Sequence, residues 1–115
     1  MWSSFAAAFR GLTRAWATQK HFRFDILVGL LVFVLGVWSR LAPWEWIVVF
    51  SAVIAMLVLE LLNTVAEFLC DLLQPRLHAA VAVVKDVAAA AVLVGAAGAA
   101  GVGLLIFLPH LLRYK

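Results

Sequence analysis

The chain has 115 residues, of which 67% are hydrophobic and only 13% are charged. Soluble domains average about 45–50% apolar and about 25% charged residues, so this composition excludes an ordinary soluble domain and indicates one integral-membrane domain. The formal net charge of +3 does not favour nucleic-acid binding, and the single cysteine, Cys70, excludes an intrachain disulfide framework.

The first 20 residues predict an amphipathic helix that lies in the membrane interface. Large apolar side chains recur at spacings of three and four, which places them on one helical face: Trp2, Phe5, Phe9, Leu12 and Trp16. Arg10 and Arg14 point in other directions, and tryptophan favours the headgroup region. A helix packed on a partner is the alternative, and we favour an interfacial helix over about residues 2–20.

Three long apolar segments predict membrane spans at about residues 22–41, 43–73 and 85–108. About 20 residues suffice to cross the hydrocarbon. The second segment would be ~45 Å long as a helix, so its polar end should project beyond the hydrocarbon. Gln74-Pro75 should end it, residues 76–84 should form a connector that can begin a new helix, and Pro109 should end the third span.

The basic residues are distributed unevenly between the two ends of these spans. One side carries more of them than the other: Arg10, Arg14, Lys20, Arg23, Arg76 and Lys85, against Arg40, Arg113 and Lys115. The positive-inside rule makes the first side cytoplasmic. The glycine-rich run Val94–Gly103 lacks the Lys-Ser/Thr ending of a phosphate loop, so we interpret it as close helix packing.

A stripe of polar residues crosses the end of the second span. Wound as a helix at about 100° per residue, four side chains fall within about 80° of one another: Glu60, Asn63, Glu67 and Asp71. An ionisable group at bilayer depth costs at least ~2.5 kcal/mol on insertion scales, so such residues usually mark a functional site. Polar contacts that simply hold helices together are the structural alternative.

Carboxylates, an amide and a lysine that converge at a cytoplasmic membrane surface suit phosphoryl transfer. Magnesium prefers oxygen ligands and commonly uses one or two carboxylates together with substrate phosphates. Glu67 is the leading ligand candidate, and Lys85 can neutralise a nucleotide phosphate as a point charge. Glu60 lies about 10 Å deeper by helical rise, where it could accept a proton from a lipid alcohol.

Several motifs carry a resemblance to a known family. ELLNTVAEFLCDLL at Glu60–Leu73 is followed by His78 and then by VVKDVAAAAVL at Val83–Leu93. AFRGLTRAW (Ala8–Trp16) and HFRF (His21–Phe24) lead into the first span. Together these segments resemble the prokaryotic integral-membrane diacylglycerol kinase and undecaprenol kinase family over nearly the whole chain.

The resemblance implies an all-α membrane protein with three transmembrane helices and an interfacial helix, forming one lipid kinase domain over residues 1–115. It further implies a homotrimer with active sites at subunit boundaries, ATP as co-substrate and Mg²⁺ as cofactor. The protein would lie in the bacterial inner membrane with its active site facing the cytoplasm. The lipid alcohol would be undecaprenol or diacylglycerol, and the segments LLIFLPHL and KDVAAAAVLV look closer to the undecaprenol type.

By position, the resemblance also implies roles for individual residues. Glu60 would be the general base, with Asn63 and Asp71 beside it. ATP would be bound by Arg76, His78, Lys85 and Asp86, and the lipid by Arg14, Trp16 and Glu60. The metal would be held by Glu67 and Gln19. Gln19 stands where the family commonly has a glutamate, so metal affinity should drop, and Asp25 is a candidate substitute.

Two functions from other classes remain open. One is a small oligomeric membrane transporter or proton pathway that uses the intramembrane glutamates. The other is a structural membrane subunit without chemistry. Transport predicts carboxylates near the middle of the bilayer, whereas the acids here gather towards one side with a lysine, which favours the kinase.

Overall fold

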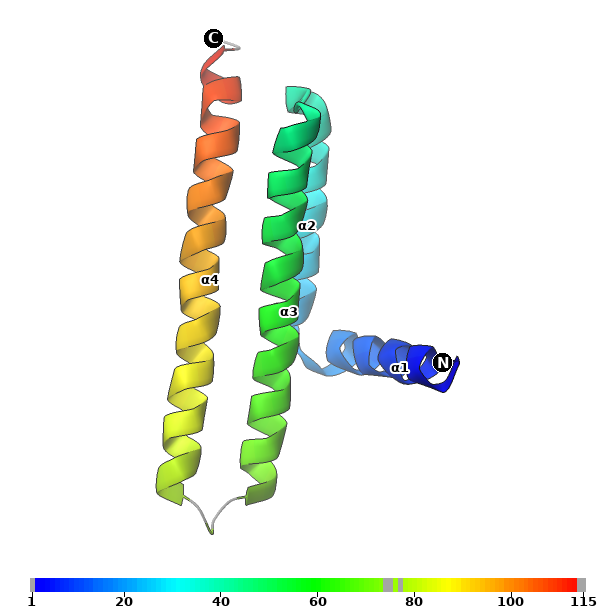
Figure 1. The fold of residues 1–115 in the computed structure, drawn as a ribbon, viewed down its shortest axis with the longest axis vertical. Coiled ribbons are helices and arrows are strands. Elements are labelled where there is room, and N and C mark those ends of the chain that lie inside the picture. The colour runs from blue at the N-terminus through cyan, green and yellow to red at the C-terminus, as the bar shows by residue number, and fades with distance from the viewer. Residues whose placement is uncertain (1, 74–75, 77, 114–115) are drawn as a thin grey trace.

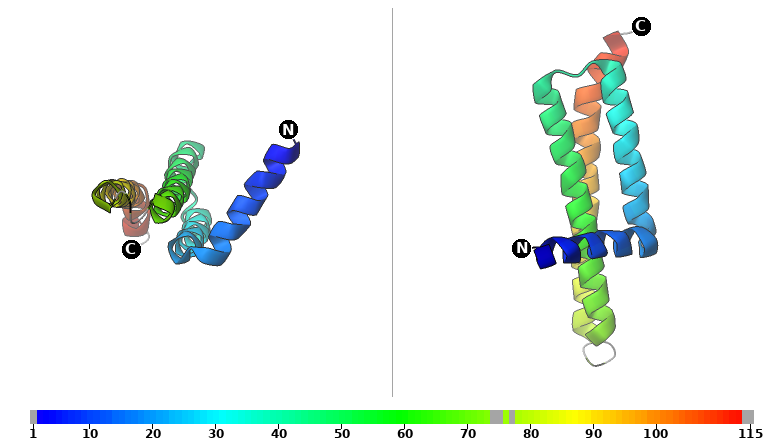
Figure 2. Two further views of the ribbon diagram at one scale, coloured as in Figure 1. Left: turned by 90° about the horizontal axis from the view of Figure 1, so that it is seen from below. Right: turned by 90° about the vertical axis from the view of Figure 1, so that its right-hand side faces the viewer.

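The computed structural model describes residues 2–73, 76 and 78–113, and within them the chain forms four helices. These are α1 (Trp2–Thr18), α2 (Lys20–Ser39), α3 (Pro43–Leu73) and α4 (His78–Arg113). The three long helices run side by side, and α1 lies across them (Figures 1 and 2). Each long helix is long and apolar enough to cross a membrane, which confirms the predicted three spans.

Helix α1 confirms the predicted N-terminal amphipathic helix, although it ends at Thr18. Only Ala15 is buried in it, and the predicted apolar face is exposed within the chain at Trp2, Phe5, Phe9, Leu12 and Trp16. Gln19 alone joins α1 to α2, with an extended backbone at φ −110° and ψ 106°. Because one residue makes this joint, the placement of α1 is tied directly to the first span.

The joint between α2 and α3 is a tight corner. Arg40 takes the left-handed conformation with φ 56°, and the Leu41 N–H donates to the carbonyl oxygen of Gly36 at 3.3 Å. Such a cap satisfies carbonyls that a helix end leaves unpaired. Proline is well suited to the first helical position, because the backbone N–H it lacks has no partner there. Helix α3 accordingly begins at Pro43.

Helix α3 occupies the predicted range, whereas α4 is longer than predicted at both ends. The predicted break at Gln74-Pro75 lies outside the described residues, as does Lys115. Helix α4 begins at His78, which agrees with the prediction that the connector before Lys85 can begin a new helix. It also continues through Pro109 to Arg113. A proline inside a helix removes one ladder hydrogen bond and tends to kink the helix, but spanning helices tolerate it where neighbouring groups satisfy the freed carbonyl.

A small apolar core holds the corner end of the bundle together. It comprises Leu41, Val49, Ile106 and Phe107, with partly buried neighbours from α2, α3 and α4. Towards the opposite end, the Cys70 thiol lies 3.8 Å from the carbonyl oxygen of Val81 and is buried, as a structural cysteine would be. Most other apolar side chains face outwards, which suits a helix surface covered by lipid or by a partner.

The glycines of α4 explain its packing only in part. Gly95 lies against Leu59 and Met56 of α3, so the packing role predicted for the glycine-rich run is confirmed there. A Cβ added at Gly98 or Gly101, which lie three residues apart on one face, would meet nothing within 4 Å. This face of α4 is therefore open within the described part of the subunit, whereas Gly103 lines the cavity between the three spans.

Candidate active site

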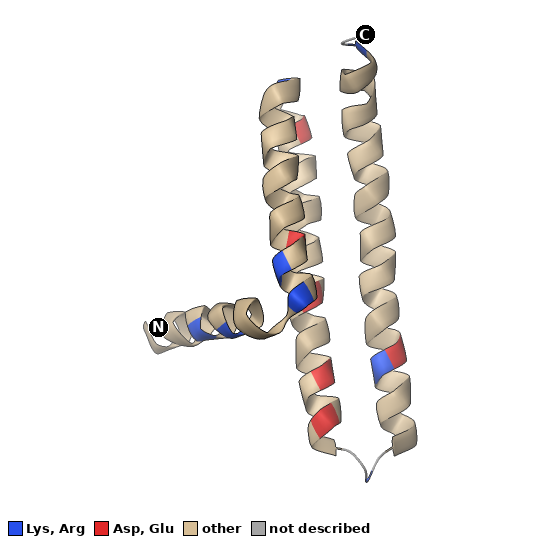
Figure 3. Ribbon diagram, turned by 180° about the vertical axis from the view of Figure 1, so that it is seen from behind, with Lys and Arg blue, Asp and Glu red and all other residues tan. Residues whose placement is uncertain are grey.

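Charged side chains concentrate at one end of the bundle. Acidic residues lie along the part of α3 at and beyond the level of α1, and a pair of opposite charges lies on the same end of α4 (Figure 3). At this end α3 and α4 continue past the level of α1 (Figure 1). Helix α3 has 31 residues and is about 46 Å long, against about 30 Å of hydrocarbon in a bilayer. If α1 lies at the interface, these charges stand where water reaches them.

A cleft of about 790 Å³ separates α1 from this half of α3. Arg14 and Gln19 line it from the α1 side, and Glu67 and Asp71 line it from α3. The two predicted metal ligands, Gln19 and Glu67, thus share one cleft. Asp25, the candidate substitute for Gln19, is not among its lining residues and lies instead in a second cavity, between the three spans.

The polar stripe of α3 is held by local hydrogen bonds. The Asn63 Nδ2 donates to Glu67 Oε1 at 3.1 Å, which orients the carboxylate one helical turn away. The Thr64 hydroxyl donates to the backbone oxygen of Glu60 at 2.9 Å. Side chains four residues apart on a helix lie over one another, which explains both contacts.

Asp71 and Lys85 join α3 to α4 across the same end. The Lys85 Nζ lies 3.5 Å from Asp71 Oδ1, and the two side chains are 42% and 70% exposed. An exposed ion pair of this kind contributes about 0–1 kcal/mol to stability. Each group can therefore leave the pair and bind a charged ligand at little cost. The remaining predicted nucleotide contacts, Arg76, His78 and Asp86, are exposed nearby in the chain.

Glu60 differs from the other carboxylates in its burial. Its residue is only 8% exposed, whereas Glu67 and Asp71 are exposed. Asp25, His21 and Glu67 act on its carboxylate electrostatically. Withdrawing a carboxylate from water costs free energy, and ionisable residues at bilayer depth usually mark a functional site.

The residues present fit a magnesium ion that completes its shell with substrate oxygens. Among the described residues, no cluster of three or more His, Cys, Asp or Glu side chains could hold a metal alone. Glu67 and Gln19 nevertheless offer one carboxylate and one amide oxygen in the same cleft. Magnesium typically takes one or two protein carboxylates and keeps water and phosphate as its other ligands.

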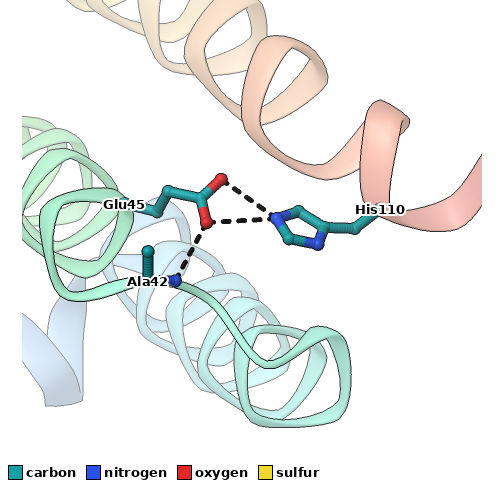
Figure 4. A network of polar contacts seen from close by, with 3 residues as sticks. All are labelled: Ala42, Glu45 and His110. Atoms are coloured by element: carbon teal, nitrogen blue, oxygen red, sulfur yellow. Dashed lines mark hydrogen bonds and ion pairs between the residues drawn. The ribbon is translucent and has the colours of Figure 1, made fainter. Parts of the chain in front are cut away.

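One polar cluster at the opposite end was not predicted. The Glu45 carboxylate accepts a hydrogen bond from the Ala42 N–H at 2.9 Å, and both its oxygens lie 3.0–3.1 Å from His110 Nε2 (Figure 4). The sequence did contain one signal, because an acidic residue three positions after the N-cap residue commonly accepts a hydrogen bond from the N–H of that residue. The partner His110 lies 65 positions away and could not be inferred from spacing.

The fold and the site together define a multi-pass membrane enzyme whose polar site combines a buried carboxylate with exposed carboxylates, an amide and a lysine. The family profile described as "Prokaryotic diacylglycerol kinase" matches residues 6–107. The chain belongs to that family and is an ATP-dependent lipid kinase. The transporter and the structural subunit are thereby set aside.

Similar proteins come from several bacteria. The "Undecaprenol kinase" of Bacillus subtilis (strain 168) is 38% identical over 108 residues, which cover 94% of this chain and 88% of the relative. A "Diacylglycerol kinase" of Synechocystis is 36% identical over 95% of this chain, which spans 63% of that relative. The "Diacylglycerol kinase" of Escherichia coli (strain K12) is 28% identical over 76% of this chain and 71% of its own length.

Proposed function

We propose that this chain transfers the γ-phosphate of ATP to undecaprenol at the cytoplasmic face of the membrane. The observation that carries the proposal is the stripe on α3, where buried Glu60 and exposed Glu67 share one face beside the α1–α3 cleft. Undecaprenol is favoured over diacylglycerol because the Bacillus subtilis relative matches over 88% of its length. The orientation follows from the excess of basic residues at the end of the bundle that carries the site.

In this proposal Glu60 acts as the general base. Its carboxylate accepts the proton of the lipid hydroxyl while the hydroxyl oxygen attacks the γ-phosphorus, and ADP leaves with the electrons of the broken P–O bond. Burial suits the role, because a lipid alcohol reaches the site from the bilayer. Glu67, about 10 Å further along the helix, faces water and the nucleotide.

Magnesium, held by Glu67 and Gln19, would neutralise charge on the transferred phosphate. Asn63 keeps Glu67 oriented through its hydrogen bond. ATP would be bound by Arg76, His78, Lys85 and Asp86. Lys85 would leave its ion pair with Asp71 to contact a phosphate group. The lipid headgroup region would meet Arg14 and Trp16 of α1.

A homotrimer is part of the proposal. The open glycine face of α4 and the exposed apolar surfaces of the spans allow another subunit to pack closely. A neighbouring subunit would close the site from the side that the described chain leaves open. Cross-linking of the purified protein in lipid micelles tests the assembly.

The direct test is phosphate transfer from labelled ATP by purified protein in mixed micelles. Undecaprenol and diacylglycerol are offered separately, each with and without magnesium. We expect labelled undecaprenyl phosphate, dependent on magnesium, at a higher initial rate than labelled phosphatidic acid. A faster rate with diacylglycerol contradicts the substrate, and no transfer to either lipid contradicts the function.

Glu60→Gln should reduce turnover by at least about a thousandfold, because the amide cannot accept the proton. Binding of an ATP analogue should be unchanged, since the base acts on the alcohol. Glu45→Gln, which neutralises a carboxylate at the other end of the same helix, is the matched control and should retain turnover at 25 °C. Near-normal turnover of Glu60→Gln would remove Glu60 from the base role.

A further inference from the structure

Asp25 is an acidic residue of the spans to which the proposed reaction gives no role. It lies on α2, one turn beyond His21, and its Oδ2 is buried without a hydrogen-bond partner among the described residues. The side chain lines an apolar cavity of about 340 Å³ between α2, α3 and α4. Burying a carboxyl oxygen without a hydrogen bond costs free energy, so the presence of Asp25 at this position needs an explanation.

The packing of α2 against α3 brings Asp25 towards Glu60. The two helices are antiparallel, and a Cβ on Gly29 would lie 3.1 Å from Val53 Cγ1, which fixes their register. Asp25 is one turn from Gly29, and it shares the cavity wall with Met56, one turn from Glu60. The two carboxyl groups interact electrostatically across the helix contact.

Two neighbouring carboxyl groups in apolar surroundings do not both ionise readily, and a proton is shared between them. Glu60 must be ionised to accept a proton from the lipid hydroxyl. The proton of the pair therefore belongs on Asp25. His21 on α2 and Glu67 on α3 also act on Glu60, with opposite signs.

We propose that Asp25 is a positioning residue that carries this proton and donates its O–H to the Glu60 carboxylate. The donation would keep Glu60 ionised and aimed at the lipid hydroxyl. A protonated carboxyl has one O–H to donate, and Oδ2 has no other hydrogen-bond partner in the described chain. The inference rests on the proposed function, in which Glu60 is the base.

Asparagine separates this role from that of a metal ligand, because its amide is neutral and still donates. Asp25→Asn should keep kcat and the magnesium requirement within about threefold of the parent, whereas Asp25→Ala should lower kcat at least about tenfold with the KM for ATP unchanged. Arg23→Gln, which removes an exposed charge two residues away on the same helix, is the control and should match the parent.

The variants are compared in mixed micelles, with ATP-analogue binding and oligomer size as checks of folding. The inference is overturned if Asp25→Asn loses as much kcat as Asp25→Ala, if it needs more magnesium, or if Asp25→Ala keeps parental kcat. If the alanine variant does not fold, Asp25→Leu takes its place, because leucine has about the size of asparagine but no donor, and it should lower kcat by the same factor. Failure of the parent to phosphorylate any lipid, or normal turnover of Glu60→Gln, would instead count against the proposed function.

Discussion

Gln19 both joins α1 to α2 and lines the cleft between α1 and α3. It is the whole joint between α1 and α2, with an extended backbone whose N–H donates to the Ala15 oxygen at 2.8 Å. Its side chain also lines the α1–α3 cleft with Glu67. An amide oxygen can ligate magnesium but brings no charge, so the metal would be held by a single carboxylate from this pair.

Gln19→Glu should lower the free magnesium concentration that gives half-maximal rate, by about three- to tenfold, because a second carboxylate joins the site. The maximal rate should change little, since the base and nucleotide contacts are untouched. Initial rates measured across a magnesium titration test this. Lys20→Gln is the neighbouring control, and an unchanged magnesium dependence in Gln19→Glu would contradict the assignment of Gln19 as a ligand.

At the residue scale, periodicity predicted what one helix can contain. The four polar residues of the α3 stripe were predicted to share a face, and the Asn63–Glu67 hydrogen bond agrees with that arrangement. Contacts between helices could not be predicted from the sequence, because they depend on how each helix is rotated about its axis and on the register between helices. The pair of Glu45 with His110 belongs to this kind.

Among the elements, the corner between α2 and α3 is the most tightly specified. Gly36 is buried, and a Cβ there would lie 2.6–2.9 Å from ring carbons of Trp46. Trp46 also stacks with Phe50, with ring centroids 5.2 Å apart, which limits how far its indole can move. The corner thus requires a residue without a side chain at position 36.

Gly36→Ala should destabilise the protein by about 1–3 kcal/mol, the usual cost of overpacking a tight contact. The midpoint of thermal unfolding in micelles should fall accordingly. Gly11→Ala on α1 is the control, because a Cβ there meets nothing within 4 Å and alanine favours the helix by about 0.8–1 kcal/mol. Equal stability of Gly36→Ala and the parent would show that Trp46 yields easily.

The helix boundaries show which local signals were decisive. Pro43 predicted the start of α3 correctly, because proline suits a first helical position. Lys85 was expected to open the third span, but a charge within a helix is not a start signal. The alanines and valines from His78 onward continue the same helix, so its true start lies at the loop.

On the scale of the whole molecule, the two ends of the bundle differ in kind. At the corner end, Glu45 and His110 tie the start of α3 to the end of α4, with side chains only 12% and 13% exposed. At the other end, the charges are mostly exposed and border the α1–α3 cleft. The corner end is stabilised by contacts between helices, and the opposite end contains the α1–α3 cleft.

His110→Ala should therefore lower stability without changing the chemistry. It leaves the nearly buried Glu45 carboxylate with the Ala42 N–H alone, and losing a buried partner costs about 1–3 kcal/mol. The thermal inactivation midpoint should fall while kcat at 25 °C stays parental. Leu112→Ala, an exposed change two residues away, is the control. A lower kcat in folded His110→Ala would show that this end communicates with the site.

The number and order of the spans could be predicted because apolar length alone decides them. The crossing of α1 and the cleft beneath it could not, since both follow from the extended backbone at one residue. Homotrimerisation stays a prediction, carried by the resemblance and by the open surface of α4.

The length of α3 has a consequence for how the enzyme is supplied. This helix is longer than the hydrocarbon is thick, so in the proposed function buried Glu60 would meet the lipid alcohol from the bilayer and exposed Glu67 would meet ATP from the water. ATP diffuses in solution, so its supply depends on its molar concentration. The lipid alcohol diffuses in the plane of the membrane, so its supply depends on its mole fraction there. Adding inert lipid at a constant bulk concentration of the lipid substrate should thus slow the reaction, because the mole fraction of the substrate in the membrane falls. Adding water leaves that mole fraction, and so the supply of the lipid substrate, unchanged.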